Sequence, residues 1–320
     1  MNKLDPSDWP RDLLSCIGFL RGLCTLLFSI ALVAPASAQL AADAQNNSTP
    51  LGNSRSARLL DKHAALSSAL ANNAFGRPLV IESIENSNRV TGHAYAVLNA
   101  PFAAASSVFQ SPSKMCDLIT LHLNTKYCRP ATAQGAPLLK VNFGKKTPQD
   151  LSDTFALEFV MQTQTATPEL LAVLLNAKDG PLGTSDYRIA IEAAPLPGGK
   201  TFMHLRYSYG FGVAGKIAMM GYLATAGSKK VGFTKTGQGA GAGYIGGMRG
   251  AVERNTMRYY LAIDAYLDSL SAPPAQQLNT RLNLWFDATE KYPEQFGDVD
   301  KPTYLSMKKA EYLRQQTDAR

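Results

Sequence analysis

The chain has 320 residues, a formal net charge of +7 and a hydrophobic fraction of 45%. This length accommodates one large domain or two small ones. The positive excess is mild, so it favours contact with anionic lipid head groups or acidic polymers without requiring either. The basic residues are scattered and form no stripe interleaved with aromatic residues, so we expect no nucleic-acid partner.

The N-terminus has the pattern of an export signal. Basic residues precede the apolar run 22–33, which is followed by the Ala-Ser-Ala triplet 36–38, an A-x-A cleavage site. The run has about 12 residues, whereas a membrane-spanning helix needs roughly 20. We therefore predict a signal peptide at 1–38, cleavage after Ala38, and a mature protein that is periplasmic or secreted.

Two cysteines, Cys16 and Cys24, leave with the signal peptide, and Cys116 and Cys128 remain. In an oxidising compartment, cysteines this close are expected to form a disulfide. The spacing is not C-x-x-C and only His122 lies between the pair, which argues against a metal site. We predict a Cys116–Cys128 bridge, no metal and no cofactor.

The first half of the mature chain starts with a polar leader and a helix. Residues 39–54 are small and polar, which predicts a disordered leader. Apolar residues then recur at helical spacing over 55–73. The next elements are predicted to be strands at 79–84 and 90–98 and short helices at 102–110 and 112–121.

Further strands are expected between the disulfide and residue 209. Their apolar and polar residues alternate, and short turns join them, which favours an antiparallel meander. In the last strand Tyr207 and Tyr209 share a side with Leu205, opposite His204 and Arg206. The strands are predicted at 138–143, 154–163, 170–177, 187–193 and 201–209.

The small-residue segment 212–226 has two interpretations. It is either a buried helix packed through glycine and alanine, or a lid that touches a membrane surface transiently. A single lysine gives the segment no basic amphipathic face, which favours the buried helix. A strand is expected at 229–236, and the glycine-rich tract 237–247 lacks the Lys-Ser/Thr of a phosphate loop and is expected to be mobile.

The C-terminal part is predicted to be helical. Over 246–270 a stripe of apolar and tyrosine residues steps by three and four, which predicts a long helix with one buried face. Pro273 and Pro274 end this helix. Residues 276–320 are predicted to form two more helices rich in charge.

This order of elements resembles the helix-grip architecture of START-like proteins, which include lipid-transfer domains and polyketide cyclases. The segments 75–79, 232–234 and 246–267 are also similar to those of exported bacterial proteins of unassigned function. The resemblance implies an α+β fold in which a curved antiparallel sheet wraps around a long C-terminal helix. It places a START-like domain at 55–272 and a helical extension at 273–320.

The resemblance implies a ligand cavity between the long helix and the sheet. We therefore expect non-catalytic binding or carriage of an apolar or amphipathic small molecule, such as a lipid. Arg254 and Arg258 share a helix face, and one interpretation is that they hold the ligand's polar head. The alternative is that they are solvated or paired with Glu158 and Glu192. The other expected ligand-binding residues are Tyr207, Val252, Thr256, Tyr259 and Ile263.

Two other functions stay open. One is a cyclase-type or hydrolase-type enzyme that uses His204, Tyr207 and Glu253, although the mature chain has no H-E-x-x-H motif and no G-x-S-x-G motif. The other is a cell-envelope interaction protein that docks a partner through its helical tail. The enzyme hypothesis requires His204 and Glu253 to reach the same pocket.

Overall fold

The central element is an antiparallel sheet of eight strands in the order β1-β2-β8-β7-β6-β5-β4-β3. The computed structural model describes residues 51–224, 230–237 and 242–317, so the predicted signal peptide and most of the predicted leader lie outside the described residues. The strands are β1 (Leu79–Glu85), β2 (Arg89–Leu98), β3 (Thr125–Ala133), β4 (Ala136–Phe143), β5 (Phe155–Thr167), β6 (Leu170–Asp179), β7 (Thr184–Leu196) and β8 (Lys200–Phe211).

The chain crosses the sheet once and then returns strand by strand. After β2, the helices α3 (Phe102–Phe109) and α4 (Pro112–Ile119) lead to β3 at the far edge. From there β3 to β8 follow as a meander until β8 pairs with β2, where His93 lies opposite Arg206. The predicted meander is therefore confirmed.

One strand, β3, was not predicted from the sequence. It contains Pro130 and does not alternate cleanly, because only its first half is buried. Proline is tolerated there because β3 is an edge strand with a partner on one side only. The strand carries Cys128, which is joined to Cys116 of α4 with 5.2 Å between the Cα atoms. The predicted disulfide therefore fastens this edge to the helix beside it.

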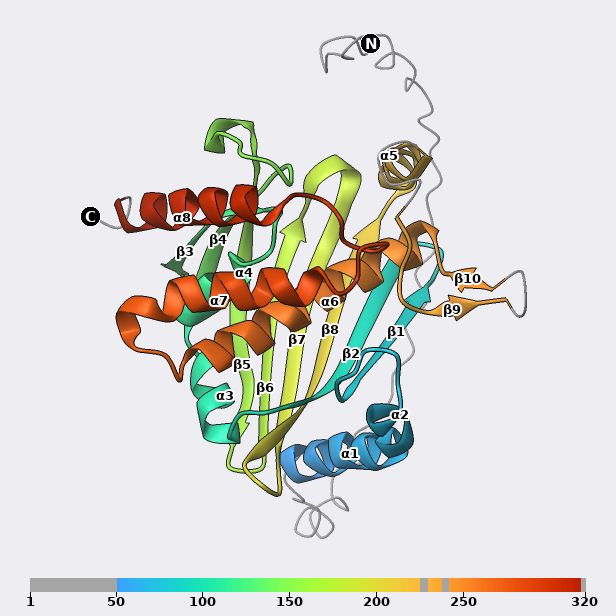
Figure 1. Ribbon diagram of the computed structural model, residues 1–320, viewed down its shortest axis with the longest axis vertical. Helices are drawn as coiled ribbons and strands as arrows, with labels where there is room; N and C mark the ends of the chain where they lie inside the picture. Colours follow the sequence, from blue (N-terminus) through green and yellow to red (C-terminus); the bar gives the residue numbers. More distant parts are fainter. Residues whose placement is uncertain (1–50, 225–229, 238–241, 318–320) are drawn as a thin grey trace, which may run out of the picture. The chain divides into compact units, whose positions relative to one another are not determined.

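The long helix α6 (Gly247–Ser269) lies across β1, β2 and β8 (Figure 1). Its residues Val252, Thr256, Tyr259 and Ile263 are all buried, as predicted. The expectation of a single buried face is wrong, because α7 (Pro274–Thr289) packs on the helix and most of its other side chains are buried as well. A curved antiparallel sheet packed against a long C-terminal helix is the helix-grip arrangement, so the predicted fold class is confirmed.

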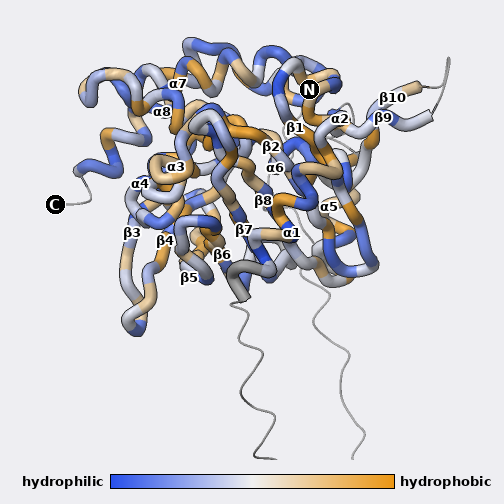
Figure 2. The backbone as a smooth tube through the Cα atoms, turned by 90° about the horizontal axis from the view of Figure 1, so that it is seen from below, coloured by the Kyte–Doolittle hydropathy of each residue, from blue (hydrophilic) through white to orange (hydrophobic). Residues whose placement is uncertain are grey.

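Two further helices continue the same core. Among the side chains of α7, Trp285 is buried and donates a hydrogen bond from Nε1 to the carbonyl oxygen of Arg258 at 3.1 Å. In α8 (Lys301–Thr317), Tyr304 is fully buried and stacks on Trp285 with 4.9 Å between ring centroids. The hydrophobic stretches gather where helices meet strands, and hydrophilic stretches follow the outer turns of α7 and α8 (Figure 2). The predicted tail helices thus bury their aromatic residues on their own domain.

The other face of the sheet carries a smaller core. It lies under α1 (Leu51–Ala65) and α2 (Ser67–Ala71), which pack on β1, β6, β7 and β8. Because α1 begins at Leu51, residues 51–54 of the predicted leader are helical. The buried side chains of this core are Leu59, Leu70, Tyr95, Leu170, Ala194 and Phe202.

The segment after β8 departs from expectation. Helix α5 (Val213–Ala224) packs on β8, α6 and the turn η2 (Pro181–Gly183), but three of its apolar side chains are exposed. The preferred interpretation of 212–226 as a buried helix is therefore wrong. The helix makes contact on one side only, through small residues such as Gly215. The strand expected at 229–236 is reduced to β9 (Lys235–Thr236), which pairs with β10 (Gly243–Tyr244).

Candidate ligand site at the helix–sheet interface

Four tyrosines meet between α6 and the sheet and form what we call the tyrosine cluster. Tyr187 comes from β7, Tyr207 and Tyr209 from β8, and Tyr259 from α6. The ring centroids of Tyr207 and Tyr259 are 5.3 Å apart, and those of Tyr187 and Tyr209 also lie 5.3 Å apart. The cluster ends at His122, whose ring lies 4.9 Å from that of Tyr259. Residues that are distant in sequence thus form one continuous aromatic group.

The hydroxyls of this cluster are mostly without partners. The hydroxyl of Tyr187 lies 2.9 Å from Oγ1 of Thr184. Within the described part of the chain, the hydroxyls of Tyr207, Tyr209 and Tyr259 have no hydrogen-bond partner, although these residues are only 3–6% exposed. Three such hydroxyls on largely buried side chains give the otherwise apolar core one polar place.

All members of the cluster are uncharged near neutral pH. Burial raises the pKa of the Tyr207, Tyr209 and Tyr259 hydroxyls well above the ordinary value. The pKa of His122 is well below its ordinary value, first because the ring is buried and then because Arg258 carries positive charge nearby. The cluster therefore offers neutral hydroxyl donors and no charge.

The protonation of His122 follows from its surroundings. Its Nδ1 accepts a hydrogen bond from the backbone N–H of Asn124 at 3.1 Å, so the proton of the neutral ring is assigned to Nε2. Nε2 is buried and has no partner at hydrogen-bond distance and angle among the described residues. His122 thus adds a fourth donor without a partner to this region.

The predicted binding residues of α6 do not all border the cluster. Tyr259 is part of it, and Val252 and Ile263 are buried on the same side of the helix. Thr256 lies where α6 crosses β2, and its Oγ1 donates to the carbonyl oxygen of Val252 at 2.8 Å. A Cβ added to Gly92 would overlap the Thr256 side chain, so helix and strand already touch there. That crossing leaves no room for a ligand.

Arg254 and Arg258 bind groups outside the sheet. Arg258 Nη2 is 2.7 Å from Oδ2 of Asp298, and Arg254 Nη1 donates to the carbonyl oxygen of Val231 at 3.0 Å. The expected pairing with strand carboxylates is wrong, because the loop between α7 and α8 supplies the partner of Arg258. The strand carboxylates have other partners: Glu158 pairs with Lys140, and Glu192 with Arg55 and His204.

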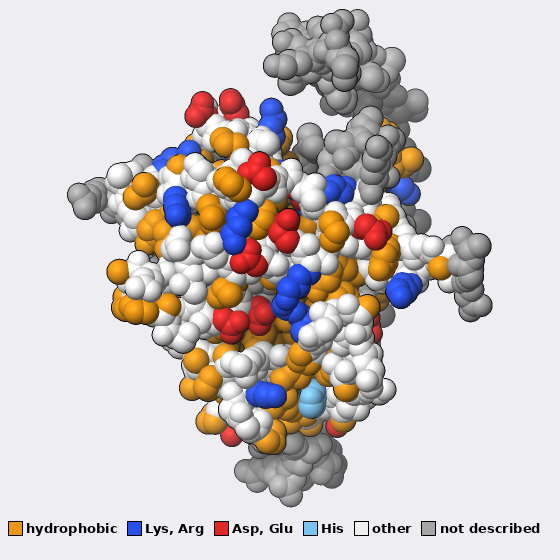
Figure 3. Space-filling view, viewed as in Figure 1, with side chains coloured by type: hydrophobic (Ala, Val, Ile, Leu, Met, Phe, Trp, Pro, Cys, Tyr) orange, Lys and Arg blue, Asp and Glu red, His pale blue; other side chains and the backbone are white. Residues whose placement is uncertain are grey.

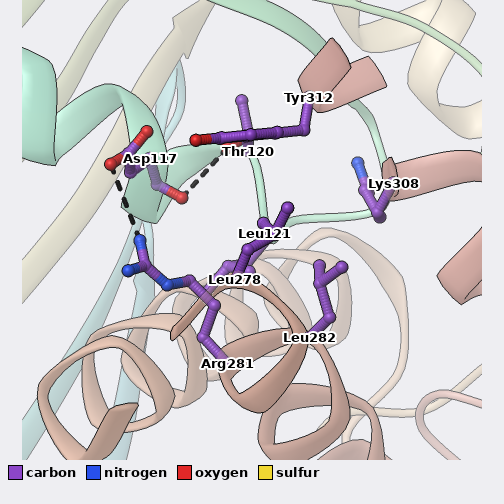
Figure 4. Close-up of a pocket in the computed structure, with 8 residues that line it drawn as sticks. All are labelled: Asp117, Thr120, Leu121, Leu278, Arg281, Leu282, Lys308 and Tyr312. Atoms are coloured by element: carbon purple, nitrogen blue, oxygen red, sulfur yellow. Dashed lines mark hydrogen bonds and ion pairs between the residues drawn. The ribbon is translucent and has the colours of Figure 1, made fainter. Parts of the chain in front are cut away.

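No ligand-sized space borders the tyrosine cluster in the pockets found among the described residues. Two small pockets lie elsewhere, and each encloses about 10 Å³, which is about the space of one water. The first lies between α4, α7 and α8, where Asp117 pairs with Arg281 at 3.6 Å (Figure 4). The second lies over the Arg258–Asp298 pair. Neither of these two pockets reaches the tyrosine cluster.

Glu253 organises the start of α6 instead of facing a pocket. Its fully buried carboxylate accepts hydrogen bonds from Ser83 Oγ at 2.5 Å, from the backbone N–H of Phe233 at 2.6 Å and from both N–H and Oγ1 of Thr234 at 2.9 and 2.7 Å. The ring of Phe233 in turn lies 5.7 Å from that of Phe75. The three segments that resemble exported bacterial proteins therefore meet at one place.

His204 belongs to a separate group on the α1 side of the sheet, the histidine pair His93–His204. Nε2 of His204 lies 2.9 Å from Nδ1 of His93, and its Nδ1 lies 3.3 Å from Glu192, which also pairs with Arg55 of α1. A glutamate–histidine pair can serve as a general base, but here the next group is a second histidine and not a nucleophile. Glu253 lies on the α6 side, so the structure does not bring the three residues of the enzyme hypothesis together.

No cluster of three His, Cys, Asp or Glu side chains suited to a metal ion occurs within residues 51–224, 230–237 and 242–317. Sequence reasoning placed Tyr207 and Tyr259 in the site and named Tyr209 as a neighbour, but it missed Tyr187 and His122. Neither residue stands out by spacing, because strand pairing and the loop after α4 bring them to the cluster.

Neither a protein-family model nor a curated protein sequence matches the chain. Solved structures do match it, at low sequence identity. Human StAR-related lipid transfer protein 5 matches 68% of this chain and 99% of its own, with 8% identity and a TM-score of 0.35. Norcoclaurine synthase from Thalictrum flavum matches 47% of this chain and 80% of its own, with 15% identity and a TM-score of 0.30.

A third match is a conserved protein of unknown function from Enterococcus faecalis, which covers 78% of this chain and 96% of its own, with 8% identity and a TM-score of 0.29. Of these three structures, the first is named as a StAR-related protein. The similarity is too distant to transfer a ligand or an activity, and the helix-grip assignment stands on the strand order and the position of α6.

Proposed function

We propose that this chain is an exported, non-catalytic protein that binds an amphipathic small molecule, such as a lipid, between α6 and the sheet. The observation that carries the proposal is that the hydroxyls of Tyr207, Tyr209 and Tyr259, which belong to largely buried side chains in one apolar core, make no hydrogen bond in the described chain. A ligand oxygen that accepted these donors would remove the cost of leaving them unpaired.

The surroundings of the cluster favour a ligand that is mostly apolar. Buried aliphatic side chains share one core with it, among them Leu205, Val252 and Ile263. Apolar walls with a few fixed polar groups are the usual lining of a small-molecule site. Because the hydroxyls and His122 are neutral, the polar group that fits best is a neutral acceptor, such as an ester or ketone oxygen. A ligand carboxylate is disfavoured, because burying its charge costs free energy and the cluster has no cation to pair with it.

Neither of the two described pockets reaches the cluster, so we expect ligand entry to require part of the structure to move. Helix α5 is the element best placed for this, since it packs on η2 beside Tyr187 and contributes only partly buried residues, Met219 and Leu223, to the core. Displacement of α5 would open the β7–β8 end of the cluster. The export part of the proposal is supported by the predicted signal peptide and by the disulfide, which persists in oxidising compartments.

The test uses the mature protein and two probes, a pyrene-labelled fatty-acid methyl ester and a pyrene-labelled alkane of the same length. Tyr207→Phe with Tyr259→Phe should weaken ester binding about tenfold, in line with about 1.4 kcal/mol of lost hydrogen bonding, and leave alkane binding unchanged. Tyr304→Phe is the matched control, because it also removes a buried hydroxyl, but one that already donates to the carbonyl oxygen of Leu121 and does not belong to the tyrosine cluster.

Failure of wild-type protein to bind either probe would overturn the proposal. Equal losses for both probes would show that the hydroxyls serve packing and not ligand recognition. Native mass spectrometry of protein purified from its own cell envelope supplies an independent check, because a bound lipid would appear as a discrete added mass.

A further inference from the structure

Strand β3 is an edge strand, and α8 packs on it where a ninth strand of the sheet would lie (Figure 1). An edge strand presents N–H and C=O groups that can pair with another chain. In β3 the N–H of Cys128 donates to Oε1 of Gln315 at 3.2 Å. The carbonyl oxygen of Lys126 accepts from Nη2 of Arg314 at 2.8 Å. Two side chains of α8 therefore make hydrogen bonds that a neighbouring strand would otherwise make.

The same helix also binds the backbone that leads into β3. The hydroxyl of Tyr304 donates to the carbonyl oxygen of Leu121 at 3.0 Å. Nζ of Lys308 donates to the carbonyl oxygens of His122 and Thr125, both at 2.8 Å. A helix that packs only to bury apolar surface needs no hydrogen-bonding groups on its buried side, so this side of α8 is matched to the backbone of the edge. Its buried residues are Tyr304, Met307, Lys308, Glu311 and Gln315.

The part of β3 beyond the helix is protected in another way. Residues 125–128 are buried, whereas residues 129–133 are mostly exposed. N–H groups that face the same edge recur at every second residue of a strand, and no register shift separates Cys128 from Pro130. Pro130 therefore occupies the next position at this edge, and it has no N–H to offer. Proline and a covering element are two ways in which proteins keep edge strands from pairing, and β3 has both.

We propose that α8 is an edge guard, which keeps β3 from pairing with β3 of a second copy of the chain. The two groups that α8 covers are complementary to each other. In an antiparallel pair centred on Tyr127, Cys128 of one copy lies opposite Lys126 of the other, so the covered N–H would bond to the covered carbonyl oxygen. A two-fold axis makes the same bond twice, so each copy satisfies the other. This inference does not depend on a ligand at the tyrosine cluster.

The docked position of α8 depends on one buried carboxylate. Glu311 lies 3.2 Å from Nζ of Lys126 on β3 and 2.8 Å from Nζ of Lys308 on its own helix. Removing one partner from a buried ion pair leaves an uncompensated charge, which is strongly unfavourable.

The opposite side of α8 is solvated. Leu313 is 64% exposed there, and the outer surface over α7 and α8 carries acidic and basic side chains interspersed (Figure 3). A substitution at Leu313 therefore changes the helix without touching the edge. None of the helices in the described ranges, α8 included, is long and apolar enough to cross a membrane.

The test uses the mature protein with Glu311→Lys, which places a third cation beside Lys126 and Lys308 and should displace α8. At low protein concentration, hydrogen exchange followed by NMR should show the N–H of Cys128 exchanging at least tenfold faster than in wild type. As the concentration rises, sedimentation velocity should show a dimer that wild type does not form. In this dimer the N–H of Cys128 should be protected again, because it bonds to the second copy. The control Leu313→Glu should behave as wild type does.

A second variant decides the matter if circular dichroism shows that Glu311→Lys does not fold. Arg314→Ala with Gln315→Ala removes the two side chains that bond to the edge and keeps Glu311 in place, and it should give the same results. The proposal is overturned if the N–H of Cys128 exchanges as slowly in the folded variants as in wild type, or if the variants expose it and stay monomeric. A dimer that leaves this N–H unprotected, or the same dimer in wild type, would also overturn it. Probe binding at the tyrosine cluster is a separate measurement, so the two proposals fail independently.

Discussion

The side chain of Thr256 packs against Gly92 at the point where α6 crosses β2. A Cβ on Gly92 would overlap Oγ1 of Thr256 and would lie 3.2 Å from the carbonyl oxygen of Val252. The missing side chain therefore sets how closely the helix approaches the sheet. This contact fixes the position of the rest of α6, including Tyr259 one turn further along.

Gly92→Ala should destabilise the protein by about 1–3 kcal/mol, because the added methyl group has to push α6 away from β2. Gly212→Ala is the control, since an added Cβ at that glycine meets nothing within 4 Å. Chemical denaturation followed by circular dichroism measures both variants. A loss of similar size in the two would show that glycine-specific packing at the crossing is not the cause.

Glu253→Gln should be among the more damaging single changes in α6. The carboxylate accepts from two backbone amides and two hydroxyls, and an amide side chain would turn its NH₂ group toward some of these donors. We expect a loss of about 2–4 kcal/mol in the free energy of unfolding. The control Glu158→Gln affects a carboxylate that is 62% exposed and paired with Lys140, and should cost less than about 0.5 kcal/mol. Near-equal stabilities of the two variants would contradict this role for Glu253.

The parts of the fold that the sequence predicted are those with a strong local period. The alternation at 201–209 placed Tyr207 and His204 on opposite faces of β8. The stripe of α6 identified residues that are buried, but it did not predict that α7 buries the other side of the helix. The edge strand β3 has no such period, because only one half of it is buried and Pro130 interrupts it. The alternation of apolar and polar residues therefore does not predict a strand that is buried along only part of its length.

The candidate site depends on relationships that no local pattern contains. Tyr187 meets Tyr207 and Tyr209 because of the pairing of β7 with β8, which includes a register shift between Ser185 and Arg188. Likewise, the partner of Arg258 is 40 residues away in a loop between two helices. The exposure of α5 was misjudged for a related reason, since an all-apolar segment gives no indication of which side its neighbours cover.

Acidification should weaken the fold through the histidine pair. Burial first, and then positive charge from His204 and Arg206, lower the pKa of His93 from 6.5 to about 4. Between these values the unfolded chain binds the proton more readily than the folded one, so stability falls as pH drops from 6.5 toward 4. After a discount for the partial exposure of His93, the expected loss is about 1–2 kcal/mol.

His93→Asn should reduce the slope of the stability profile over this window, measured as the free energy of unfolding at pH 7 and pH 4.5. The slope that remains should include His122, whose pKa burial also lowers. The window avoids the main loss from Glu192, whose pKa is lowered to about 2 by its hydrogen bond with His204, so that its contribution is lost mostly below pH 4.5. His63→Asn, on the same side of the sheet, is the control. An unchanged slope in His93→Asn would show that other groups cause the acid sensitivity.

Asp298 holds the loop between α7 and α8 to the domain. Its carboxylate lies 2.7 Å from both Arg258 Nη2 and Lys146 Nζ, and 3.5 Å from Lys230 Nζ. Three cations converge on this carboxylate, and they lower its pKa despite burial. Removing the charge while keeping the shape leaves the buried guanidinium of Arg258 without its counter-ion, and such a loss typically costs about 3–5 kcal/mol.

Asp298→Asn should therefore detach the tail more than it unfolds the sheet. We expect limited proteolysis to cut between α7 and α8 at least tenfold faster, because that loop depends on the Asp298 pairs for its attachment. Asp287→Asn is the matched control, since Asp287 lies on α7, is 59% exposed and pairs only with Lys301 among the interactions described for it. If the tail instead serves to dock a partner and is held weakly to its own domain, wild type and Asp298→Asn should be cut at the same rate. Faster cutting in Asp298→Asn, without a change in Asp287→Asn, would show that the aromatic residues of α7 and α8 are packed in the core of this chain.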